Sequence, residues 1–332
     1  MKKAKDTAYL YLSANIRAQE TKMVGMQALK KMISAYTPEE AYKTVTDAGI
    51  GLDYDYKDFE SALTQELSST YERLEKSAPD PEMFKIFRYK YDGHNLKALI
   101  KAESIGADTQ GLLVPLGTVD EKTLRTGLHD GGFGSLEPKL AQAALAARDS
   151  LAKVNDPQLV DVIIDRAVLE SMSAQAKQYK SKFLTRLVNA NIDIANIRSF
   201  VRIKRIGQEL SFLKQVLAEG GSIPAERYCD VFLKDFDEFF SLLDSTPYGP
   251  ALSPAYEAVR NKGTLSLFEK LCDNYMIGVL KESRFIPFGI EPVLSYLVAK
   301  ENEAQAIRIV MASKIAGVSP DKITERLRET YA

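Results

Sequence analysis

Two pairs of polar side chains recur at a spacing that brings them together on a helix. Asp92 is followed three residues later by Asn95, and Asp193 in the same way by Asn196. Residues three apart lie on one helix face, so each carboxylate is expected beside an amide. Catalysis would also need a nucleophile or a base close by, and neither sequence neighbourhood supplies one. The pairs are therefore interpreted as structural, bonding to the end of a neighbouring helix.

Each pair belongs to a longer repeated pattern of residues, the frame, which occurs a third time in the chain. An aliphatic and a basic residue follow each Asn, and a glycine stands eleven residues after it. The frame repeats after 101 residues and again after 110, where Glu303 and Ala306 replace the acid and the amide. The positions expected as repeated structural sites or partner contacts are Asp92, Asn95, Lys97, Asp193, Asn196, Arg198, Arg202, Arg205, Glu303 and Arg308.

A basic stripe forms part of the central copy. Its arginines are spaced four and three residues apart and so share one helix face, with Lys204 beside them: Arg198, Arg202 and Arg205. The stripe could bind an anion or an acidic partner, but it also fits a solvated face opposite a buried one. No aromatic residues interleave with it, which argues against RNA binding.

Other residue types that carry chemistry are isolated. His94 and His129 each lack cysteines or carboxylates at metal-ligand spacing. The glycine run at 131–134 lacks the Lys-Ser/Thr of a phosphate loop, and it does not follow a strand as a dinucleotide motif does. We expect no catalytic residue, no cofactor and no metal.

Composition excludes several classes of protein. The 332 residues carry 44 Lys+Arg and 45 Asp+Glu, a formal charge of −1, which shows no excess suited to nucleic acid. The two cysteines form no disulfide or zinc framework, and a reduced cytosolic compartment is the plain interpretation. No run approaches the roughly 18 apolar residues that span a bilayer. We expect a protein that is neither secreted nor membrane-spanning.

Helical signals position these residues along the whole chain. Apolar residues recur at helical spacing over 8–36. Capping boxes are expected at Thr37 and Thr118, each with Glu three residues later. A last helix is expected to begin at Ser319 and to end at Tyr331. Long alternating strand patterns are missing, so the fold class is all-α.

The frame spacing divides the chain into three similar helical modules, 1–106, 107–207 and 208–332. A period near 100 residues is longer than the roughly 20–50 residues of solenoid repeats. Three such modules fit an arrangement around a common pseudo-threefold axis better than a rod.

The C-terminal stretch 289–318 closely resembles the end of the C subunits of the bacterial and archaeal V/A-type rotary ATPases, which are relatives of the eukaryotic d subunits. The resembling pattern is Glu-Pro, then Tyr, Lys-Glu-x-Glu, Ile-Arg, Lys and Gly. The stretches 90–97 and 191–198 match further landmarks, and the resemblance covers essentially the whole chain. Ala306, where the other copies carry Asn, argues against a chemical task for that position.

The resemblance implies a funnel-shaped, pseudo-threefold protein that performs no chemistry itself. Such a protein sits on the cytoplasmic face of the membrane rotor ring, which is built of proteolipid subunits, and receives the central shaft of the D and F subunits. It couples ATP turnover to H⁺ or Na⁺ transport. The resemblance also implies one copy per complex, a monomer in isolation and no nucleic-acid partner.

Two alternatives remain open at the level of sequence. One is a helical scaffold that binds an acidic partner or RNA through the stripe at 198–205. The other is an all-α enzyme whose site is formed between modules.

Overall fold

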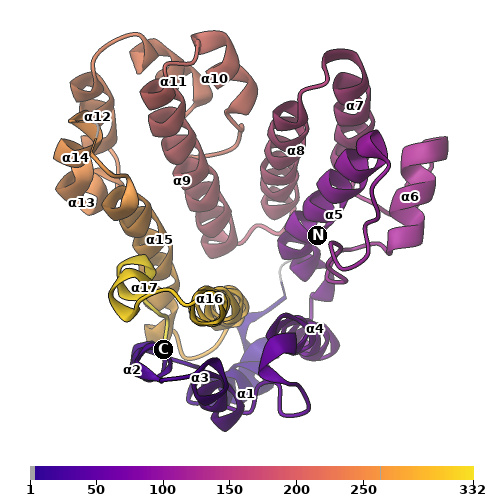
Figure 1. The fold of residues 1–332 in the computed structure, drawn as a ribbon, viewed down its shortest axis with the longest axis vertical. Helices are drawn as coiled ribbons and strands as arrows, with labels where there is room; N and C mark the ends of the chain where they lie inside the picture. The colour runs from indigo at the N-terminus through magenta and orange to yellow at the C-terminus, as the bar shows by residue number, and fades with distance from the viewer. Residues whose placement is uncertain (1–3, 262) are drawn as a thin grey trace. The chain divides into compact units, whose positions relative to one another are not determined.

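The computed structural model describes residues 4–261 and 263–332, and within them the chain is all-helical, without a strand (Figure 1). This confirms the predicted fold class. The described chain forms two compact units. The first is Glu82–Leu243, and the second joins the two outer segments, Ala4–Pro81 and Asp244–Ala332. The division into three modules and the funnel shape stay predictions.

The first half of Glu82–Leu243 is built on two long helices, α5 (Lys85–Ile105) and α8 (Pro157–Gln178). The helix α7 (Pro138–Val154) packs against both, and the short α6 (Glu121–Asp130) packs on α5 and α7 (Figure 1). Fully buried side chains such as Leu96, Leu140 and Ile164 fill the space between them. Removing this apolar surface from water is the main stabilising term.

The second half of this unit surrounds α9 (Lys182–Ile206). Three shorter helices follow it: α10 (Leu210–Val216), α11 (Ala225–Phe232) and α12 (Phe236–Asp244). Their core is aromatic. The ring of Phe200 stacks on Phe239 with centroids 4.0 Å apart and meets the edge of Phe232 at 5.5 Å. Such ring pairs contribute roughly 0.5–1.5 kcal/mol beyond their buried area.

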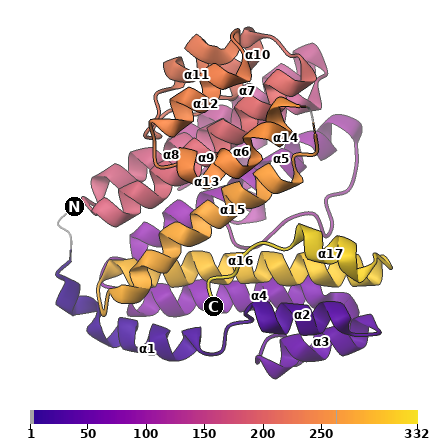
Figure 2. The ribbon, with the colours of Figure 1, turned by 90° about the vertical axis from the view of Figure 1, so that its left-hand side faces the viewer.

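The second unit is organised around α16 (Ile290–Ile315), which buries residues on most of its circumference. Helices from the start of the chain pack against it (Figure 2): α1 (Leu10–Glu20), α2 (Met26–Ser34), α3 (Pro38–Asp47) and α4 (Phe59–Ser77). The remaining helices of this unit come from its C-terminal segment: α13 (Gly249–Leu252), α14 (Tyr256–Arg260), α15 (Ser266–Lys281) and α17 (Pro320–Arg326). The short 3-10 turns are η1 (Asp6–Tyr9), η2 (Tyr56–Asp58), η3 (Pro81–Phe84), η4 (Ser253–Ala255) and η5 (Glu282–Phe285).

The predicted start of α3 is confirmed. The Thr37 hydroxyl accepts a hydrogen bond from the Glu40 amide at 3.1 Å, with Pro38 at the first helical position. The glycines of the frame adopt the left-handed conformation that ends a helix, with φ of 64° at Gly106, 73° at Gly207 and 68° at Gly317.

Three expected boundaries are wrong. The capping residue of α6 is Asp120, whose carboxylate accepts from the Thr123 amide at 2.7 Å, while Thr118 binds elsewhere. The last helix has Ser319 as its N-cap residue, as predicted, although the side chain makes no capping hydrogen bond; the helix ends at Arg326, short of the predicted Tyr331. The helical pattern at 8–36 is interrupted at residues 21–25, between α1 and α2.

Candidate functional site

The first copy of the repeated frame is a polar clip, by which we mean the acid and amide of a long helix bound to the backbone of a loop. The Asp92 carboxylate accepts hydrogen bonds from the Thr118 amide at 2.8 Å and from its hydroxyl at 2.7 Å. The Asn95 amide exchanges two bonds with the backbone of Val114, at 2.8 and 2.9 Å. A Cβ at Gly117 would lie 2.3 Å from the Asp92 carboxylate, so the loop approaches only because this residue is glycine.

The second clip, on α9, repeats this geometry. The Asp193 carboxylate accepts from the Ser222 amide at 2.8 Å and the Ile223 amide at 3.1 Å. Asn196 exchanges two bonds of 2.9 Å with the backbone of Ala218. The loop before α11 is thereby fixed on α9, as the loop before α6 is fixed on α5.

The third clip binds a loop from the opposite end of the chain. The Glu303 carboxylate of α16 accepts from the amide of Val24, in the loop that leads into α2. It also pairs with the buried Lys300, whose ammonium reaches Glu66 of α4 at 2.8 Å. Ala306 has no amide to offer, so this clip holds its loop through the acid alone.

Burial shifts the pKa of two of the clip acids, Asp92 and Glu303, and of the lysine beside Glu303. Burial raises the pKa of Asp92, against the hydrogen bonds from Thr118 that lower it. Burial likewise raises the pKa of Glu303, against the attraction of Lys300. Burial acts to lower the pKa of Lys300, but the charges of Glu303 and Glu66 raise it above its ordinary value. Asp92 is 0% and Glu303 4% exposed, so a dissolved substrate does not reach either carboxylate in this conformation.

The basic residues that follow the first and third clips join helices. Lys97 of α5 pairs with Asp165 of α8 at 2.5 Å, and Arg308 of α16 pairs with Glu60 of α4 at 2.8 Å. A neighbouring pair, Lys101 with Asp161 at 2.6 Å, adds a second link between α5 and α8.

The arginines of the predicted stripe differ in exposure. Arg202 is exposed, whereas Arg198 and Arg205 are half-buried. The Lys204 ammonium donates to the carbonyls of Phe232 and Lys234 at 2.5 Å, which binds it to the C-terminal end of α11. Burial lowers the pKa of Lys204. Of the ten expected positions, Arg202 alone is exposed, and the others are buried or half-buried, so most of them act inside the fold.

Comparison with known proteins identifies the family. The profile described as ATP synthase (C/AC39) subunit matches residues 12–326. The chain belongs to this family. It is 27% identical to the C subunit of the V-type sodium ATPase of Enterococcus hirae over 327 residues, 97% of this chain and 99% of the relative. It is 25% identical to the C subunit of the A-type ATP synthase of Methanocaldococcus jannaschii, over 96% of this chain and 86% of the relative. The predicted resemblance is thereby confirmed.

The structure of this C/AC39 family member shows how its histidines are used. A ring nitrogen of His94 lies 2.9 Å from the Leu112 carbonyl, and His129 pairs with the adjacent Asp130. Over residues 4–261 and 263–332 no three His, Cys, Asp or Glu side chains are grouped to hold a metal ion. In the same part of the chain, no helix has the length and apolar character that crossing a bilayer requires.

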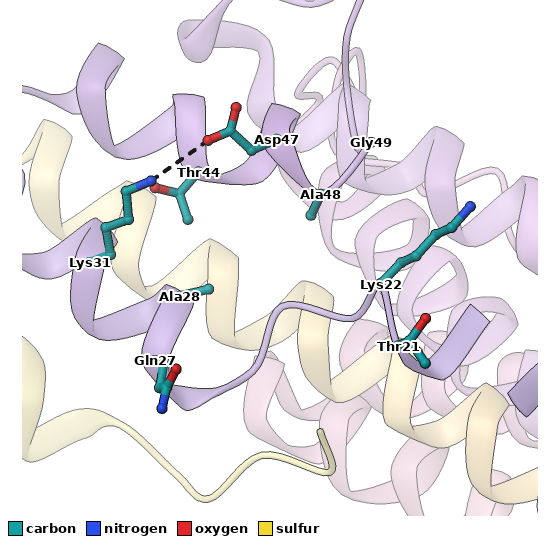
Figure 3. Close-up of a pocket in the computed structure, with 9 residues that line it drawn as sticks. All are labelled: Thr21, Lys22, Gln27, Ala28, Lys31, Thr44, Asp47, Ala48 and Gly49. Carbon is teal, nitrogen blue, oxygen red and sulfur yellow. Dashed lines mark ion pairs between the residues drawn. The ribbon is translucent and has the colours of Figure 1, made fainter. Parts of the chain in front are cut away.

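An open pocket of about 840 Å³ lies between α2, α3 and the turn after α1 (Figure 3). Lys31 and Asp47 face each other across one side, 3.7 Å apart. The pocket is lined by Thr21, Lys22, Gln27, Ala28, Lys31, Thr44, Asp47, Ala48 and Gly49. Its single carboxylate is paired with a lysine, and the lining offers no arrangement of nucleophile and base.

Sequence reasoning missed the lysines that cap the short helices. The Lys314 ammonium donates to the carbonyls of Ile33 and Ala35 at the end of α2, as Lys204 does at the end of α11. The sequence carried a signal for this role, because Lys204 stands eight residues after Asn196 and Lys314 stands eight residues after Ala306, the same position of the frame. In the first copy of the frame, the corresponding residue is Glu103, which cannot donate to carbonyls. The last turn of α6 is capped by Arg148 of α7, which donates to the Leu128 carbonyl.

Proposed function

We propose that this chain is a non-catalytic central-stalk component of a rotary V/A-type ATPase. It seats on the rotor ring at the cytoplasmic face of the membrane, receives the shaft of the D and F subunits, and couples ATP turnover to H⁺ or Na⁺ transport. The observation that carries the proposal is similarity over nearly the full length of both chains to the C subunit of a V-type sodium ATPase. The chain is proposed to be a monomer in isolation, with one copy in each complex and no cofactor.

A protein that transmits torque must resist deformation, and the polar clips supply that resistance. In the first and second clips, each loop donates hydrogen bonds to an acid and exchanges hydrogen bonds with an amide side chain. A hydrogen bond to a charged group contributes roughly 1.5–3 kcal/mol, and more is lost when a buried partner is left unsatisfied. The paired ion bridges between α5 and α8 oppose sliding of one helix along the other. We propose that the three-module plan distributes this resistance around a central axis.

The test compares two activities of the reconstituted ATPase. ATP-driven ion pumping into vesicles is measured together with ATP hydrolysis by the detached catalytic head, with and without this chain. Pumping is expected to disappear without the chain, while the head still hydrolyses ATP. Pumping that survives complete removal of the chain would refute the proposal.

A further inference from the structure

Residues 327–332, which follow α17, connect the two sequence segments of the second unit. They have no regular secondary structure, and we call them the strap. One part of the strap lies on α15, where Arg328 pairs with Asp273 at 2.6 Å. Another part reaches α1 and the turn at 21–25, which belong to the first segment of this unit. The strap therefore holds the early helices of the chain to the late ones.

Tyr331 is the anchor of the strap. Its side chain is 3% exposed, and its hydroxyl donates to the Glu20 carboxylate of α1 at 2.8 Å. The guanidinium of Arg284, in η5, lies 4.6 Å from the centre of its ring, which is a cation–π contact. Leu327 is the other buried side chain of the strap. The strap is thus held by one ring, one aliphatic side chain and partly exposed polar contacts.

The strap packs beside the third clip, which lacks the amide of the other two. A Cβ at Gly25 would lie 3.3 Å from the backbone oxygen of Ala332, so the two backbones are nearly in contact (Figure 1). The preceding amide, of Val24, is the one that donates to Glu303. In the first two clips an Asn supplies a second hold on the loop, and in the third clip the strap lies where it can supply one.

The strap differs from an Asn side chain because it can detach. The last turn of α1 has an attachment of its own, since Arg17 pairs with Glu20 at 2.8 Å and donates to the Ile286 carbonyl at 2.7 Å. Segments that bury few apolar side chains open locally, at a lower free energy than global unfolding. Detachment of the strap would therefore leave α1 in place and remove one hold from the turn at 21–25.

We propose that the strap is a detachable second hold of the third clip, so that this clip opens when Tyr331 leaves Glu20 while the first two clips stay closed. Thr21 and Lys22 of the released turn line the open pocket between α2 and α3, so opening moves one edge of that pocket (Figure 3). The device is a property of this chain alone and does not depend on the proposed function.

The experiment is native-state hydrogen exchange of the full chain, which measures the opening of individual amides. Val24 reports on the third clip, and the Glu329 amide, which donates to Asn274 at 3.0 Å, reports on the strap. Ala218 reports on the second clip, and amides in the middle of α16 report on the core of the second unit.

The test variants are Tyr331→Ala and Tyr331→Phe. The matched control is Tyr36→Ala, because Tyr36 lies between α2 and α3 in the same unit and is 95% exposed.

In wild-type chain, the Val24 and Glu329 amides are expected to exchange about 100-fold faster than those of α16, relative to their unfolded rates. Their exchange should depend little on urea, because the opening exposes little surface. Tyr331→Ala should accelerate both by about 30-fold or more, since it truncates a buried ring. Tyr331→Phe keeps the ring and loses the hydrogen bond, so about 3- to 10-fold is expected. Ala218 in these variants, and every reporter in Tyr36→Ala, should change by less than about threefold.

Faster exchange of Glu329 without faster exchange of Val24 would overturn the proposal, because the third clip would then be held by its acid alone. Exchange of Val24 only together with the α16 amides would also overturn it, since the clip would have no opening of its own. Unchanged rates in Tyr331→Ala would remove the anchor, and equal acceleration of Ala218 would show that the effect is not confined to the third clip. Each of these four results would leave the proposed function intact.

Discussion

Replacing Asn196 by alanine removes both hydrogen bonds that hold Ala218 in the second clip. Ala218 is 1% exposed, so its amide and carbonyl would lose their partners without gaining water. Each unsatisfied buried group costs about 1–3 kcal/mol, which sums to about 2–6 kcal/mol for the two groups. The free energy of unfolding is measured by urea titration followed by circular dichroism. An equal slope of this free energy against urea concentration in variant and wild type shows that the unfolded state is unchanged.

The first clip supplies the matched comparison. Asn95→Ala removes the same two bonds, but Val114 is only half-buried and water can replace them. The expected loss is therefore smaller, about 1–2 kcal/mol. Gln142→Ala, at an exposed site on α7 of the same unit, serves as a control and should change stability by less than about 0.5 kcal/mol. A loss for Asn196→Ala that is no larger than that for Asn95→Ala would refute the reasoning from burial.

Two further predictions address the same clips. Gly221→Ala places a Cβ 2.2 Å from the Asp193 carboxylate and should lower the free energy of unfolding in urea by about 1–3 kcal/mol. The control is Gly132→Ala, whose Cβ meets nothing within 4 Å and which should be nearly neutral. Equal effects of the two substitutions would contradict the packing argument. Burial raises the pKa of Asp92, so the folded state keeps the carboxyl proton to a higher pH than the unfolded state does. The protonated carboxyl therefore adds stability below the ordinary pKa of 3.8, and this added stability is lost as the pH rises. Asp92→Asn keeps an acceptor for Thr118 without titrating, and its stability relative to wild type should increase from about pH 3.5 to about pH 7; a constant difference would contradict the assignment.

Local patterns predicted the all-helical class and the start of α3 because that information is local. A glycine that must adopt positive φ is visible in the sequence, and so is the Thr37 cap with its proline. Thr118 shows where this fails. Its spacing to Glu121 fits a capping box, but Asp120 stands closer to the helix and Asp92, 26 residues earlier, takes both donors of Thr118.

The partner of Glu303 could not be predicted for a stronger reason. The repeated spacing predicts a bond to the end of a neighbouring helix, whereas on α5 and α9 the bonded backbone lies in the segment that follows the long helix. The loop on Glu303 instead precedes it by 279 residues, at Val24. The exposure of Lys180 was equally invisible, since this residue lies outside the repeated frame and its exposure depends on the turn between two helices.

The differences between the clips favour a mechanical role over a chemical one. Glu303 stands where the other copies have Asp, and Ala306 where they have Asn. The lysine that caps α11 and α2 is replaced at α6 by an arginine from another helix. Catalysis depends on the identity and pKa of a particular group, so such exchanges would change a reaction. Fixing a loop depends only on placing some acceptor or cation within reach of the backbone. What the three copies share is therefore the position of a loop on a long helix, which is the property that a rigid coupling part requires.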